Sequence, residues 1–159
     1  MYSIDSHEGI VSSILFPVDF ENCFISAGED CTARINDIRT GKAVKEFYHS
    51  NYVNSLAIAN NNRDLICADE NGTIKIWDIN KGESRTEYNS NTEEDGFAFR
   101  SISVSDSEGF LIGAKSSGVC CVFDYGHDRD LKLISSFEAH KTYVTKCVLS
   151  PEDKYFFIN

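Results

Sequence analysis

Short apolar runs separated by polar turns follow one another along the whole chain. Residues 11–16, 24–27 and 32–35 are three such runs near the start. Clusters of Asn, Asp, Gly and Ser bound the runs, which is typical of β-strands joined by tight turns. No stretch keeps the periodicity of an amphipathic helix over about ten residues. The pattern therefore predicts an all-β fold.

The run from Leu65 to Asp78 recurs along the chain, because a short apolar strand, a polar turn, a second strand and a closing aspartate come back at a nearly constant distance. The closing residues are Asp37, Asp78 and Asp124. The turn positions are Asp30, Asn71 and Ser117. A period of about 40–45 residues with four strands per repeat predicts the blades of a β-propeller.

We expect three complete four-stranded blades and an incomplete fourth. Their ranges are 7–48, 49–94, 95–138 and 139–159. Propellers usually close with about four to eight blades, so about three and a half blades are expected to be part of a larger ring or the product of a truncated gene model. An open stack of blades would leave strand edges unpaired, which favours association.

The charge balance limits the classes of partner. The chain has 15 basic and 25 acidic residues, a net charge of −10, and its Lys and Arg residues form no run. Direct binding to a nucleic-acid backbone is therefore disfavoured. No window approaches the roughly 18 apolar residues of a membrane span, and the first residues do not resemble a signal peptide. We expect a soluble cytoplasmic protein that does not insert into membranes.

The six cysteines are expected to be structural thiols. None has the spacing C-x-x-C, and the neighbours Cys120 and Cys121 would point to opposite faces of a strand. Most stand among apolar residues, where cysteine acts as a small apolar side chain. We therefore expect neither a metal site nor a cofactor.

Histidine recurs four residues before a valine, at His7, His49 and His140. Asp95 holds the same place in the third unit. Each histidine is expected to face the turn residue and the third strand of its own blade, in a buried His–Ser–Trp–Asp chain of hydrogen bonds. The alternative assigns the histidines and aspartates to acid–base catalysis. One such group in every blade favours the structural interpretation, because an active site is needed only once.

Trp77 is the only tryptophan, and Asn36 and Phe123 hold the equivalent positions. The second blade is therefore expected to be the best specified. The chain contains no G-x-S-x-G, no H-E-x-x-H and no glycine-rich phosphate loop. A propeller hydrolase remains a remote alternative, since the innermost strands carry no charged cluster beyond Arg100 and Lys146.

The repeat resembles the WD-repeat family, and more narrowly the small Gβ-like WD-repeat subunit shared by the target-of-rapamycin (TOR) kinase complexes. The narrower resemblance rests on several segments spread over nearly the whole chain. These are residues 28–35, 51–56, 69–78, 137–145 and 149–151. Asn36 departs from the family pattern, because tryptophan normally precedes the aspartate there. The resemblance covers the middle half of a seven-bladed family member.

The resemblance implies a non-catalytic scaffold that binds the kinase domain of TOR complexes and stabilises it. The implied partners are the TOR kinase and its complex subunits, and the implied location is cytoplasmic, peripheral to endomembranes through the complex. The alternative within the same fold is a generic WD-repeat scaffold of a ubiquitin ligase, a trafficking coat or the ribosome, because one propeller hosts many functions.

Overall fold

The computed structural model describes residues 4–59, 62–90, 98–105, 109–125, 130–150 and 153–159. Within these ranges the chain forms fourteen strands in four antiparallel sheets, and the prediction of an all-β fold is confirmed. Three sheets have four strands each, in simple up-and-down order, and the fourth has two. The described part of the chain has no helix long and apolar enough to cross a membrane.

The strands of each sheet follow one another directly along the chain. The first sheet contains β1 (Val11–Leu15), β2 (Cys23–Gly28), β3 (Thr32–Asp37) and β4 (Lys42–Tyr48). The second contains β5 (Val53–Ile58), β6 (Asp64–Asp69), β7 (Thr73–Asp78) and β8 (Glu83–Asn89). The third contains β9 (Phe99–Val104), β10 (Phe110–Lys115), β11 (Val119–Tyr125) and β12 (Leu131–Glu138), and the fourth β13 (Cys147–Leu149) and β14 (Phe156–Ile158).

The turn between the second and third strands of each large sheet needs a left-handed backbone at one position. The φ angles there are 62° at Cys31, 74° at Gly72 and 92° at Gly118. Glycine adopts this region without a steric penalty, whereas a side chain with a Cβ is strained there. The three turns thus share one backbone conformation at equivalent places and have the same length between the second and third strands.

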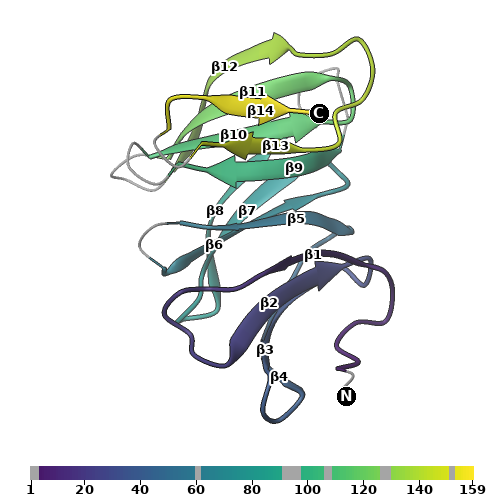
Figure 1. Cartoon of the computed structure of the whole chain (residues 1–159), viewed down its shortest axis with the longest axis vertical. Coiled ribbons are helices and arrows are strands. Elements are labelled where there is room, and N and C mark those ends of the chain that lie inside the picture. Colours follow the sequence, from purple (N-terminus) through teal and green to yellow (C-terminus); the bar gives the residue numbers. More distant parts are fainter. Residues whose placement is uncertain (1–3, 60–61, 91–97, 106–108, 126–129, 151–152) are drawn as a thin grey trace.

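The sheets are stacked in chain order, so that each buries one face against the next (Figure 1). The first strands β1, β5, β9 and β13 contact one another in succession and form the inner row of the stack. One apolar cluster lies at each junction. The first joins Ile25 and Phe47 to Leu65, the second joins Ile66 and Ile76 to Phe99 and Phe123, and the third joins Ile112 to Val144.

Serines link the inner strands directly. The backbone N–H of Leu56 donates to Ser13 Oγ at 3.3 Å, and that of Ile102 donates to Ser55 Oγ at 3.1 Å. At the third junction the N–H of Leu149 donates to a serine Oγ, that of Ser103, at 3.0 Å. These short side chains allow neighbouring inner strands to approach, because a larger side chain would separate them.

The first sheet lacks the cover that the other sheets have on their inner strand. Val11 in β1 is 42% exposed, whereas the equivalent Val53 and Phe99 are fully buried. Ile14 is likewise exposed, while the equivalent Leu56 and Ile102 are buried. In the second and third sheets, the residues equivalent to Val11 and Ile14 are covered by the preceding sheet.

All six cysteines are free thiols. Five of them lie in or against the apolar clusters, whereas Cys31 stands in the turn between β2 and β3. Cys121 belongs to the cluster between the second and third sheets, and Cys120 to the cluster on the opposite face of β11. Burial raises the pKa of the Cys120 thiol to about 12, which keeps it protonated and unreactive at neutral pH.

Candidate functional site

The first sheet contains a directional chain of hydrogen bonds that ends on a histidine and an aspartate. Asn36 Nδ2 donates to Ser26 Oγ at 2.9 Å, and Ser26 lies 2.7 Å from His7 Nε2. His7 Nδ1 lies 2.9 Å from Asp30 Oδ1. Burial raises the pKa of Asp30, but hydrogen bonds from His7, Thr32 and a backbone N–H outweigh it and hold that pKa below its ordinary value.

This arrangement has the order of a catalytic triad, yet its serine is enclosed. Ser26 is 1% exposed. Its hydroxyl oxygen accepts a hydrogen bond from Asn36, and its O–H donates to His7 Nε2. A nucleophile must reach a substrate carbon, and this hydroxyl is surrounded by the sheet itself. Asn36 stands at the position equivalent to Trp77, and its side-chain amide supplies the hydrogen bond to Ser26. These hydrogen bonds hold the turn between β2 and β3 against the segment before β1.

The second sheet uses a different set of groups around His49. Trp77 Nε1 donates to His49 Nε2 at 3.1 Å, which places the imidazole proton on Nδ1. The carboxylate nearest to Nδ1 is Asp69, at 3.8 Å. The sequence predicts Asn71 in this position. Asp69 instead takes it and accepts from the backbone N–H groups of Asn71 and Thr73 at 3.0 and 2.9 Å.

The remaining predicted positions are not equivalent to one another. Phe123 is fully buried, whereas Asp124 beside it is exposed and lies opposite Lys132 in the register of β11 and β12. The side chain of His140 is exposed, and its backbone N–H donates to the Gly118 carbonyl at 3.2 Å. The prediction for Asp95 lies outside the described residues.

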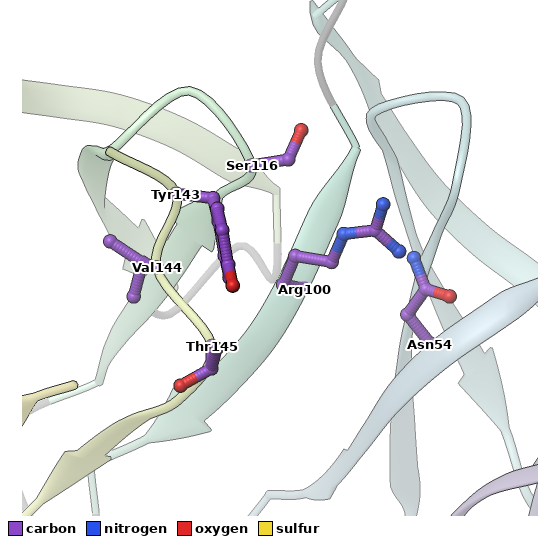
Figure 2. A pocket seen from close by; sticks show the side chains of 6 residues that line it. All are labelled: Asn54, Arg100, Ser116, Tyr143, Val144 and Thr145. Atoms are coloured by element: carbon purple, nitrogen blue, oxygen red, sulfur yellow. The ribbon is translucent and has the colours of Figure 1, made fainter. Parts of the chain in front are cut away.

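A hollow of about 590 Å³ opens where the second, third and fourth sheets meet at the inner row. Figure 2 shows Arg100 and Asn54 on one side of it and Tyr143 with Thr145 on the other. The lining residues are Asn54, Arg100, Ser116, Tyr143, Val144 and Thr145.

A bidentate ion pair fixes Arg100 at this hollow. Its two terminal nitrogens donate to the carboxylate of Glu70 at 2.7 and 3.0 Å. Asn54 Nδ2 donates to the same carboxylate at 2.8 Å and to the Phe99 carbonyl at 3.0 Å. The Arg100 side chain is still 42% exposed and lines the hollow, while its ion pair with Glu70 joins the second and third sheets.

The position of Arg100 is special within the repeat. The equivalent Ser12 donates to the Val53 carbonyl of the next sheet, and Asn54 donates to the Phe99 carbonyl of the next sheet. Arg100 instead turns back to Glu70 of the preceding sheet. A shorter side chain at position 100 would reach toward the next sheet, as Ser12 and Asn54 do, and the hollow lies on that side.

The comparisons with known proteins agree with this repeat geometry. Residues 1–37 and 41–78 match the family described as WD domain, G-beta repeat. Two WD40 repeats lie within residues 1–78. A chain in the crystal structure of the mitotic checkpoint complex superposes on this chain with a TM-score of 0.85 at 17% identity, over 98% of this chain and 48% of that chain. At this identity the likeness shows the fold alone.

Two curated relatives resemble this chain over nearly its whole length. The target of rapamycin complex subunit wat1 of Schizosaccharomyces pombe is 29% identical over 98% of this chain and 49% of its own. The target of rapamycin complex subunit LST8 of Saccharomyces cerevisiae is 31% identical over 96% of this chain and 50% of its own. The chain therefore spans about half the length of these relatives.

Sequence reasoning missed one buried polar cluster between the second and third blades. Asp64 is fully buried and accepts a hydrogen bond from the Tyr125 hydroxyl of the neighbouring blade. Arg85 lies 3.4 Å from Asp64 and also pairs with Asp78. The only signal of this cluster in the sequence is Asp64, which directly precedes the apolar run 65–68 of β6. Its partners on β8 and β11 are too distant along the chain to form a motif.

The aspartates that close the first two WD40 blades should make the protein sensitive to acid. A side-chain hydrogen bond from Arg85 holds the pKa of Asp78 at about 2, and Arg39 does the same for Asp37, against an ordinary value of 3.8. A lowered folded-state pKa stabilises the protein above pH 4, and that contribution is lost as pH falls toward 2. The urea midpoint should therefore decrease over this range.

Asp78→Asn provides the matched variant for this pH series. It keeps the shape of the side chain but removes the titrating group, so its urea midpoint should change less between pH 4 and 2 than that of the unmodified protein. An unchanged pH slope in Asp78→Asn would show that other carboxyl groups cause the acid sensitivity.

Proposed function

We propose that the chain is part of a non-catalytic WD-repeat subunit of TOR complexes, and that it binds and stabilises the kinase domain. The similarity to wat1 and LST8 carries this proposal, because it extends over 96–98% of the chain. It therefore includes the third and fourth sheets, which lie beyond the residues matched to the WD-repeat family alone. A scaffold role also agrees with the enclosed Ser26–His7–Asp30 chain, whose groups are engaged with one another.

A generic WD-repeat scaffold is the alternative. The fold alone would serve a ubiquitin ligase, a trafficking coat or the ribosome equally well. The two interpretations differ in the partner and not in the architecture of the blades. A test must therefore identify the partner directly.

The decisive experiment is affinity capture of the endogenous tagged protein under gentle conditions, followed by mass spectrometry of the intact protein and of its partners. We expect the TOR kinase to co-purify in near-stoichiometric amount, and its recovery to be absent from untagged cells. In a second measurement, the purified kinase should unfold at a higher temperature with the bound subunit than without it, because a ligand that binds only the folded state stabilises it.

Capture of ligase, coat or ribosomal proteins without the kinase would contradict the proposal and favour a generic scaffold. Co-purification of the kinase without any shift in its melting temperature would retain the TOR partner and reject the stabilising role. An assay of the purified protein against a panel of hydrolase substrates should give no activity above that of a heat-denatured sample.

A further inference from the structure

Within the described part of the chain, the first and the fourth sheets each have one face that no other sheet covers (Figure 1). We call these the start face, with Ile14 and Phe16 on the first sheet, and the end face, with Val148 and Phe157 on the fourth sheet. The first two side chains are 56% and 70% exposed, and the other two are 44% and 68% exposed. Large apolar side chains gathered on an exposed face are typical of a surface that another chain covers.

The start face has the same pattern as the faces that receive a neighbouring sheet inside the stack. Ile14 and Phe16 alternate along and beyond β1, as do the apolar residues at the same positions of the other inner strands. Those residues pack in the apolar clusters between the sheets: Leu56 and Ile58 in the second sheet, Ile102 and Val104 in the third, and Cys147 and Leu149 in the fourth. The start face is therefore built to receive a sheet.

The end face repeats the pair of residues that a sheet offers to the next one. Such residues are register partners on the first two strands of a sheet: Leu15 with Ile25 in the first sheet, and Ala57 with Ile66 in the second. Val148 and Phe157 are the equivalent partners on β13 and β14. The end face thus has side chains at the positions that fit a start face.

The charge around the two faces differs in sign. Residues 1–33, which contain β1 and β2, have six Asp and Glu residues and no Lys or Arg. Residues 139–159, which contain β13 and β14, have three Lys residues and two acidic ones. Two start faces would therefore repel each other, whereas a start face and an end face attract.

We propose that two copies of the chain associate head to tail, with the end face of each copy packed on the start face of the other. The apolar side chains of both faces are then covered in both copies. Contacts between unlike faces either close into a ring or continue as a filament. Each copy has four sheets, so two copies bring eight, and propellers close with about four to eight blades. The assembly is therefore a closed pair.

The test measures the mass of the purified 159-residue chain in solution over a range of concentrations, by size-exclusion chromatography with light scattering. We expect twice the mass of one chain, with the monomer appearing only on strong dilution. A monomer at every concentration would overturn the proposal, and it is the result expected if further blades of one longer chain cover the start face. A series of larger assemblies would overturn the closed pair.

Three variants locate the contact. Ile14→Glu on the start face and Val148→Glu on the end face should each weaken the pair at least about a hundredfold, because an unpaired carboxylate would enter an apolar contact at both junctions. Ile134→Glu is the matched control, since Ile134 is 54% exposed but lies on β12 of the third sheet and on neither face. It should leave the mass of the pair unchanged.

A mixture of the first two variants tests the head-to-tail geometry. Ile14→Glu keeps an intact end face and Val148→Glu keeps an intact start face, so one junction can form between them. The mixture should contain more pairs than either variant alone. No gain on mixing would overturn the proposal, and so would a pair that persists in one of the two variants, because the contact would then join two like faces.

The mass of the unmodified chain needs no variant, so a folding defect in a variant leaves the test intact. These measurements contain no kinase. A monomeric chain would therefore leave the proposed kinase partner standing, and failure of the kinase capture would leave the closed pair standing.

Discussion

Replacing Phe123 by alanine is expected to destabilise the protein by about 3–5 kcal/mol, the usual cost of removing a large buried aromatic side chain. Phe123 is fully buried between the second and third blades. Its ring centroid lies 4.8 Å from that of Tyr88 and 6.2 Å from that of Phe99, so alanine would leave a cavity that both rings border. Urea unfolding followed by circular dichroism measures the loss.

Ile134→Ala is the control for this substitution, because Ile134 is an exposed apolar residue on β12 of the same blade. It should change the free energy of unfolding by no more than about 0.5 kcal/mol. A Phe123→Ala cost as small as that of Ile134→Ala would show that the junction between these blades contributes little to stability.

Trp77→Ala tests the sequence-based ranking of the blades. The single tryptophan predicts that the second blade is the best specified, and hence that Trp77 matters more than Phe123. The structure favours the opposite order, because Trp77 is only half-buried while Phe123 is fully enclosed. The same urea experiment decides between the two orders.

Replacing Arg85 by methionine should cost about 3–5 kcal/mol, because it removes the guanidinium that pairs with the buried carboxylate of Asp64. Asp64 is fully buried, and Arg85 is held between it and Asp78. Methionine keeps much of the aliphatic stem, so the loss arises mainly from the charge. The free energy of unfolding at neutral pH, compared with that of the unmodified protein, measures it.

Lys75→Met is the matched control, since Lys75 lies on β7 of the same blade and pairs at 3.3 Å with the half-exposed Glu87. An ion pair whose acid remains in water is worth at most about 1 kcal/mol. If both variants lost the same amount, the burial of Asp64 would not explain the effect of Arg85.

The repeat and its turns could be predicted from the sequence because they depend on local chemistry. Leu65 to Asp78 contains its own strands, turn glycine and closing aspartate, and the structure places β6 and β7 there. The carboxylate that faces His49 is harder to predict, because Asp69 ends β6 and Asn71 stands in the turn after it, and only the folded backbone decides which side chain faces the imidazole.

The hollow and the Asp64 cluster depend on contacts between blades, which no local pattern encodes. Arg100 meets Glu70 from a strand 30 residues away, and the Tyr125 hydroxyl meets Asp64 from a distance of 61 residues. The sequence does single out Arg100 as a charged residue on an inner strand. It contains no signal for the direction in which the guanidinium turns.

The serine contacts along the inner row make the distance between neighbouring blades independent of the number of residues in a repeat. Asp37 and Asp78 are 41 residues apart and Asp78 and Asp124 are 46 apart, yet Ser13 and Ser55 each accept a backbone N–H from the next inner strand. Insertions in the connecting loops thus leave the geometry of the inner row unchanged. Such a repeat tolerates loop growth during evolution, and a designer could graft peptides into its loops without redesigning the stack.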